Sequence, residues 1–198
     1  MLRTTLWLLG VLLLLLAGAA RAEEFVIRPG GANKVVFLSK APVESFEGKT
    51  AKLEGRIAVD PAAVGDSITV HVEVDLASLD TGIAKRNQHM RENHLETAKY
   101  PKAVFTGATV AGPAGARLEA GRPVAFEVEG TFALHGVSRR LRTTVEVTLE
   151  DHGGKRQLRF KTAFPVSLAA YAISRPQFLF LKLADEQAVR VTGVATAE

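Results

Sequence analysis

Three observations predict an all-β domain of about eight or nine strands. Apolar and polar residues alternate with a period of two along most of the chain, a pattern typical of strands with one buried face. Breaks that contain glycine or proline separate the alternating runs. One segment, residues 80–98, lacks the alternation and can form a helix. Strands with one apolar face must bury it against one another, so we expect a sandwich or a closed barrel.

The N-terminal segment, residues 1–22, has the features of a secretory signal. Arg3 precedes an uncharged apolar run from Leu6 to Ala20, and Ala20-Arg21-Ala22 is a small-x-small cleavage sequence. The apolar run is shorter than the roughly 20 residues that span a bilayer as a helix. The alternative is an uncleaved signal anchor. We therefore expect an exported domain that comprises residues 23–198.

Composition excludes several classes of protein. Loss of residues 1–22 would lower the net charge from +4 to +2, because Arg3 and Arg21 leave without any acidic residue. So small an excess gives no indication of nucleic acid as a partner. The chain has no cysteine, which excludes disulfides, thiol catalysis and thiolate metal sites.

The alternation of apolar and polar residues is clear in some of the predicted strands and less regular in others. Four early strands are less regular, and they are expected at Phe25–Arg28, Lys34–Lys40, Lys52–Val59 and Val104–Val110. Five later runs alternate clearly, and they lie within residues 68–76, 124–134, 140–150, 157–164 and 188–196. His135-Gly136 and Gly153-Gly154 each separate two alternating runs, so each is expected to form a hairpin turn.

The helical segment is expected to cover one open end of the barrel. Asp80 or Thr81 can cap its start, and Pro101 prevents its continuation. Ile83, Met90 and His94 fall on one stripe of such a helix. The opposite face carries Lys85, Arg86, Gln88 and Glu92. This pattern predicts that Ile83 and Met90 turn inward and that the basic face turns outward.

A metal or catalytic site at the histidines is a weaker interpretation. His89 and His94 are five residues apart, about 140° around a helix, so they do not face one ligand together. Neither Gly-x-Ser-x-Gly nor His-Glu-x-x-His occurs. A small exported hydrolase stays a third hypothesis, although we expect no metal, no catalytic residue and no enzyme. His71, Glu73 and Asp75 are expected on a solvated outer face.

Four segments, taken in order, resemble the YceI-like family of exported lipid- and polyisoprenoid-binding proteins. Ser78–Gly82 resembles the family's Ser-x-Asp-Thr segment before the helix. Arg86–Arg91 resembles its Arg-Asp-x-His-Leu-Arg stretch. Lys99–Phe105 resembles its Tyr-Pro-x-x-x-Phe start of a strand. Leu134–Arg139 resembles its Leu-His-Gly-Val-Thr hairpin, and the resemblance covers residues 24–196.

The sequence also departs from the family pattern. Asn87 replaces the usual aspartate, and Asn93–Leu95 stands where the family has an aromatic stretch. Arg28 and Asn33 stand in place of the Trp-x-x-Asp…His-Ser opening, and Tyr171–Pro176 only approximates the family's ending. These departures concern the helix and the barrel mouth, which bear on the ligand more than on the fold.

The resemblance implies an extended antiparallel β-barrel of about eight strands, lipocalin-like in shape, with one short helix between strands. It implies non-enzymatic binding, storage or transport of an apolar lipid, an isoprenoid quinone or a polyprenyl chain, in the barrel interior. No cofactor is required, and the protein would be periplasmic or secreted. Its partners would be the lipid and, transiently, a membrane. The alternative is an exported interaction module with a solid core and no ligand.

The expected lipid-binding residues are the apolar stripes of the strands together with one residue of the helix. Each of these side chains would suit a packed core equally well, and the sequence pattern does not distinguish a lipid-binding wall from a packed core. They are Val70, Val72, Val74, Met90, Phe126, Val128, Phe132, Leu141, Val145, Val147, Phe160 and Phe164.

Overall fold

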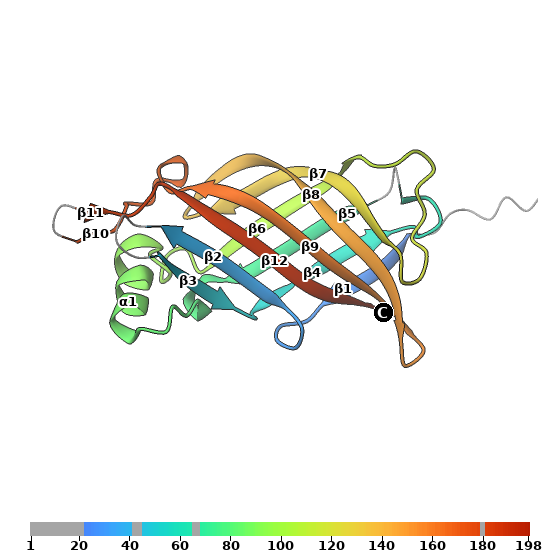
Figure 1. Ribbon diagram of the computed structural model, residues 1–198, viewed down its shortest axis with the longest axis horizontal. Helices are drawn as coiled ribbons and strands as arrows, with labels where there is room; N and C mark the ends of the chain where they lie inside the picture. Colours follow the sequence, from blue (N-terminus) through green and yellow to red (C-terminus); the bar gives the residue numbers. More distant parts are fainter. Residues whose placement is uncertain (1–21, 41–44, 65–67, 179–180) are drawn as a thin grey trace, which may run out of the picture.

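The computed structural model describes residues 22–40, 45–64, 68–178 and 181–198. It shows a long β-barrel with helical segments at one end (Figure 1). The strands are β1 Glu23–Ile27, β2 Lys34–Lys40, β3 Ser45–Thr50, β4 Leu53–Val59, β5 Thr69–Asp75, β6 Lys102–Ala111, β7 Pro123–Leu134, β8 Val137–His152, β9 Lys155–Ser167, β10 Gln177–Phe178, β11 Leu181–Lys182 and β12 Glu186–Ala197. The helical segments are η2 Leu76–Ser78, α1 Ala84–His89, the π-helical turn η3 Met90–His94 and η4 Ala169–Tyr171.

The barrel closes through one antiparallel sheet. Its strand order is β1-β4-β5-β6-β7-β8-β9-β12-β2-β3, and β1 also pairs with β12. That additional pairing, which sets Phe25 opposite Ala197, closes a ring of eight strands. Each pair of neighbouring strands in this sheet is antiparallel. The all-β fold predicted from the alternation is confirmed, and of the sandwich and the closed barrel the chain forms the barrel, as the family resemblance implied.

Strands β2 and β3 extend the wall at the α1 end, where β2 continues along the same edge of β12 that β1 occupies. The buried side chain of Asn33 spans the break between β1 and β2. Its Nδ2 donates to the Arg28 carbonyl at 2.7 Å, and its Oδ1 accepts from the Val194 amide at 3.0 Å. The amide therefore satisfies backbone groups that the interrupted ladder leaves unpaired.

The two ends of the barrel are closed differently. At the end opposite α1, the two loops that follow β4 and β6 meet, and the Leu118 amide donates to the Pro61 carbonyl at 2.8 Å. Val64, Ala116 and Leu118 from these loops are buried in the apolar cluster there. The other end carries α1 and η3 beside β3 (Figure 1). The basic and histidine side chains that line the interior cavity, Lys85, Arg86, His89 and His94, belong to α1 and η3, so this end is the candidate mouth.

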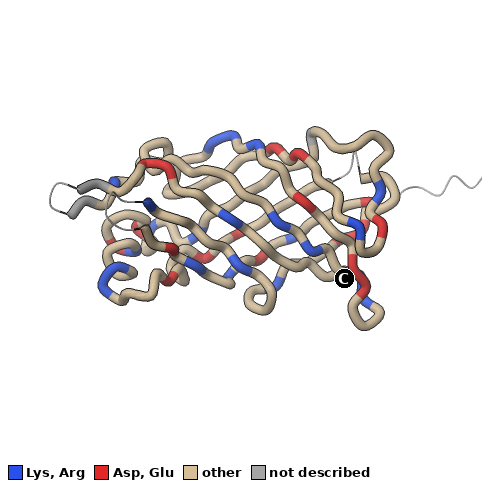
Figure 2. The backbone as a smooth tube through the Cα atoms, in the orientation of Figure 1, with Lys and Arg blue, Asp and Glu red and all other residues tan. Residues whose placement is uncertain are grey.

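Basic and acidic residues are distributed along the strands of the barrel (Figure 2), and exposed ion pairs join neighbouring strands. Lys161 lies 2.8 Å from Glu146, and Arg159 lies 2.9 Å from Glu150 across the same two strands. Exposed pairs of this kind contribute little to stability, but they keep the polar face of each strand in water. His71 belongs to this outer face, where its Nδ1 lies 2.9 Å from Thr106 Oγ1.

Two sequence predictions need correction, and one lies outside the description. The helix is shorter than the predicted residues 80–98, since α1 and η3 together run from Ala84 to His94. Strand β3 and the β10–β11 hairpin were not predicted. The predicted signal lies outside the described residues, apart from Ala22. Among the described residues, no helix is both long and apolar enough to cross a bilayer.

Candidate functional site

The interior of the barrel is hollow. A cavity of about 1310 Å³ runs from the loops opposite α1 to the α1 end, and its wall is formed by nearly every strand of the ring. Most of its lining is aliphatic or aromatic. At the closed end Leu118 forms part of the floor, beside Val59 and Ile68.

All twelve residues predicted to bind lipid lie on the cavity wall. For the eleven on strands the alternation explains this, because successive side chains of a strand point to opposite faces of the sheet. On β5, for example, Val70, Val72 and Val74 line the cavity while His71 faces outward. The others on the wall are Met90, Phe126, Val128, Phe132, Leu141, Val145, Val147, Phe160 and Phe164.

The wall also includes residues that were not predicted. Val35, Phe37 and Ser39 line the cavity from β2, and Phe46 lines it from β3. The continuous run Val35–Leu38 hides the alternation on β2, and β3 has a single large apolar side chain. Val189 and Val191 of β12 line the cavity too; the alternation places them on one face of that strand, although they were not among the expected lipid-binding residues.

Basic residues line the mouth, which corrects the prediction of an outward basic face. Lys85, Arg86 and His89 of α1 contact the cavity together with Met90. Ile83, which was expected to turn inward, does line the cavity but is 50% exposed. The carbon chain of a long basic residue can lie along an apolar surface while its charged group stays in water. A basic residue of α1 can therefore line the cavity and still expose its charge to solvent.

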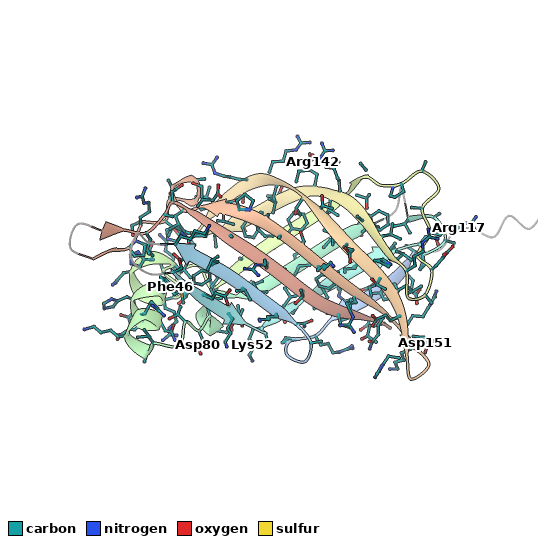
Figure 3. All side chains as sticks on the ribbon, viewed as in Figure 1. Phe46, Lys52, Asp80, Arg117, Arg142 and Asp151 are labelled. Carbon is teal, nitrogen blue, oxygen red and sulfur yellow. The ribbon has the colours of Figure 1, made fainter. Side chains whose placement is uncertain are left out.

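Arg86 is held in place by the loop before α1 and by an aromatic ring of β3. Its Nε donates to Thr81 Oγ1 at 2.9 Å, and its Nη2 donates to the Thr81 carbonyl at 2.8 Å. Its guanidinium carbon lies 4.0 Å from the centre of the Phe46 ring, a cation–π geometry. Figure 3 shows Phe46 beside α1 at this end of the barrel.

The loop before α1 is fixed by a polar network that includes a departure from the family pattern. Asn87 Oδ1 accepts from the Thr81 amide at 2.8 Å, and Asn87 Nδ2 donates to Asp80 Oδ1 at 2.7 Å. The Gly82 amide also donates to Asp80 Oδ1. These donors favour the charged carboxylate, and the Gly82 amide contributes most to lowering the pKa of Asp80 below its ordinary value of 3.8.

Two histidines tie the mouth segments together. His94 Nδ1 lies 2.8 Å from the Ser174 carbonyl, which joins η3 to the segment after η4. His135, in the β7–β8 turn, places Nε2 at 2.7 Å from Glu96 Oε2 and Nδ1 at 3.1 Å from the Tyr171 carbonyl. The contacts of both side chains join segments that are far apart in the sequence.

No group of three or more His, Cys, Asp or Glu side chains that could hold a metal ion is found in the described part of the chain. His94 faces a backbone carbonyl, and His89 lies at the exposed mouth. In the described part of the mouth, His94 therefore makes a structural hydrogen bond, and the cavity beside it is mostly apolar.

Together, the closed antiparallel ring and its apolar hollow define the class of lipocalin-like β-barrels. Residues 27–195 match the family model of the YceI-like domain. The chain therefore belongs to the YceI-like family.

Relatives by sequence are bacterial proteins named UPF0312. One from Vibrio cholerae is 30% identical over 124 residues, which are 61% of this chain and 61% of that protein. One from Shewanella denitrificans is 32% identical over 129 residues, which are 64% of this chain and 63% of that protein. The chain thus spans about three fifths of the length of the curated relatives it matches.

Solved structures share the fold. A polyisoprenoid-binding domain from Saccharophagus degradans, implicated in plant cell wall breakdown, superposes with a TM-score of 0.65 at 20% identity, over 90% of this chain and 100% of that chain. BcnA of Burkholderia cenocepacia gives 0.64 at 24% identity, over 82% and 96%. A YceI protein of Campylobacter jejuni gives 0.60 at 18% identity, over 76% and 84%.

Proposed function

We propose that this protein binds, stores or carries a lipid with a long apolar chain, an isoprenoid quinone or polyprenyl lipid, in the interior of its barrel. The observation that carries the proposal is the apolar cavity of about 1310 Å³. An eight-stranded barrel can be filled by its own side chains or can hold one ligand. Here the inward side chains leave a cavity between them.

Hydrophobic transfer supplies enough free energy for such binding without a specific polar contact. Each buried methylene contributes about 0.8 kcal/mol, so ten buried carbons contribute about 8 kcal/mol before ordering costs. That figure corresponds to roughly micromolar affinity. Isoprenoid chains offer more carbons than this. The likeness in fold to a polyisoprenoid-binding domain supports the same class of ligand.

The role is that of a non-enzymatic carrier. At the mouth, His94 and Arg86 make hydrogen bonds that hold segments of the fold together. Export by the N-terminal signal would place the protein in the periplasm or outside the cell, and loading would require transient contact with a membrane. The solid-core interaction module is disfavoured, because a packed core would leave no cavity of this size.

A single-tryptophan reporter tests the proposal. The chain has one tryptophan, Trp7, within the predicted signal, so Phe132→Trp would place the one tryptophan of residues 23–198 on the cavity wall. Thr131→Trp, on the exposed face of the same strand, is the matched control. We expect geranylgeraniol to change the emission of the Phe132→Trp variant saturably at micromolar concentration and to leave Thr131→Trp unchanged. No response at position 132, together with no retained geranylgeraniol after gel filtration, would refute the proposal.

A further inference from the structure

The α1 end of the cavity carries a positive charge, that of Arg86, which pairs with no carboxylate among the described residues. Arg86 is half-buried on the lining and makes its hydrogen bonds to Thr81, which is uncharged. Lys85 lies beside it on the same lining. Within the part of the chain that the structure describes, no Asp or Glu lines the cavity and no carboxylate pairs with either residue. By contrast, Arg142 and Arg159 on the outer face each have a glutamate.

A buried hydroxyl, that of Ser39, lines the same cavity as Arg86. Ser39 of β2 is 1% exposed, and among the described residues its Oγ has no hydrogen-bond partner. Ser39 pairs directly with Phe46 across β2 and β3, so the two side chains share the cavity face. The Phe46 ring in turn contacts Arg86. A buried hydroxyl without a partner costs free energy, and a ligand atom that accepts from Ser39 would remove that cost.

We propose that this cluster of Arg86, Phe46 and Ser39 is a subsite for an anionic head group, a carboxylate or a phosphate, on the lipid. The inference rests on the proposed function and adds the orientation of the ligand: the chain lies along the barrel and the head group lies at the α1 end. Arg86 supplies the charge and its planar N–H donors, which suit carboxylate and phosphate oxygens. Ser39 supplies an O–H donor. Lys85, which is exposed, adds to the positive potential at the mouth.

Paired ligands that differ only in the head group test the subsite. The ligands are hexadecanoate against hexadecanol, and geranylgeranyl phosphate against geranylgeraniol, titrated at pH 8 into protein purified from expression of the full chain. We expect each anionic ligand to bind at least tenfold more tightly than its alcohol, as a charged hydrogen bond in a half-buried site gives. The pair with the larger ratio identifies the head group as a carboxylate or a phosphate.

Substitutions of Arg86 and Ser39 test whether these residues cause the preference for the anionic ligand. Arg86→Gln should abolish the preference for the anionic ligand, and Arg86→Lys should restore part of it. Arg139→Gln is the matched control, because Arg139 also lies over an aromatic ring, that of Tyr171, at 6.0 Å but does not line the cavity. Ser39→Ala should weaken binding of the anionic ligand while leaving the melting temperature equal or higher, a combination that a purely structural role of Ser39 would not produce.

The outcomes separate this inference from the proposed function. Equal affinity for alcohol and anion, or a preference that survives Arg86→Gln, would overturn the anionic subsite and leave lipid binding intact. Binding of none of the four ligands would overturn both. If Arg86→Gln does not fold, Ser39→Ala and Lys85→Gln carry the test, and a full preference in both variants would then contradict the subsite.

Discussion

Thr143 and Thr162 face each other on the cavity wall, with their hydroxyl oxygens 2.9 Å apart. The other residues that β8 and β9 contribute to the wall are apolar. Thr162 Oγ1 also donates to the Thr144 carbonyl at 2.8 Å, so Thr143 can donate to Thr162. Both hydroxyl protons are thereby used within the wall, which presents methyl groups and no free donor to a ligand at this point.

The first prediction follows from that pair. Replacing both residues, Thr143→Val and Thr162→Val, should leave the affinity for geranylgeraniol within about threefold or increase it, because the added methyl groups extend the apolar wall. The change should lower the free energy of unfolding by about 1–2 kcal/mol through the lost hydrogen bonds. Titration and urea unfolding measure the two effects. A loss of affinity of tenfold or more would show that the hydroxyls bind the ligand directly.

A second prediction separates a hollow interior from a packed one. Val145→Trp should be accommodated by the cavity, with a melting temperature close to that of the unchanged protein, and it should reduce lipid binding by at least tenfold because the indole occupies the ligand's space. In a packed core the same substitution would cost about 1–3 kcal/mol. Thr144→Trp, on the exposed face of β8, is the control and should bind lipid normally.

The third prediction concerns acid stability at the mouth. Asp185 accepts from Ser167 Oγ at 2.5 Å and from the Ala169 amide at 2.9 Å. The Ser167 hydrogen bond contributes most to lowering the pKa of Asp185 below its ordinary value of 3.8. A group whose pKa is lower in the folded state stabilises the fold above the unfolded-state pKa, and this stabilisation disappears as the pH falls through the folded-state pKa.

Asp185→Asn should therefore melt at a lower temperature than the unchanged protein at pH 6, and the two melting curves should converge as the pH falls to about 2. Thermal unfolding followed by circular dichroism across this range is the measurement. A difference in melting temperature that stays constant with pH would mean that the charge of Asp185 has no part in holding the β9–η4 junction.

The fourth prediction concerns His135, which joins Glu96 to the Tyr171 carbonyl. His135→Ala should lower the free energy of unfolding by about 2 kcal/mol. The His135 side chain is mostly buried, so its removal leaves the Tyr171 carbonyl without its hydrogen-bond donor. His152→Ala, at the exposed end of β8, is the control and should change the free energy of unfolding by less than about 0.5 kcal/mol. Equal effects in urea unfolding would contradict a structural role specific to His135.

Much of the barrel follows from the sequence because its strands have one apolar and one polar face. The two hairpins at His135-Gly136 and Gly153-Gly154 form as predicted, and all four residues have positive φ angles. Strand β3 gave no such signal: at Gly48 an added Cβ would lie 2.2 Å from the Phe37 ring, so a neighbour's ring fills the place of a side chain.

The site was predictable in its walls but not in its mouth. Alternation identifies inward residues such as Val145, but the same pattern serves a packed core. Whether the interior is hollow depends on side-chain volume relative to barrel radius, which the number and stagger of the strands determine. The orientation of Arg86 depends on Phe46, which lies on a strand that the sequence did not predict. A helical projection of residues 80–98 contains no information about that contact.

The most direct test of lipid binding is mass spectrometry of the protein as cells produce it. The full chain would be expressed with its N-terminal segment, purified without detergent, and both measured intact under native conditions and extracted with chloroform and methanol. We predict a native mass above that of the polypeptide, and an extract that contains an equimolar isoprenoid or other long-chain lipid. The Val145→Trp variant should lack this lipid. A native mass equal to the polypeptide alone, with no lipid in the extract and no uptake of added geranylgeraniol, would contradict the account.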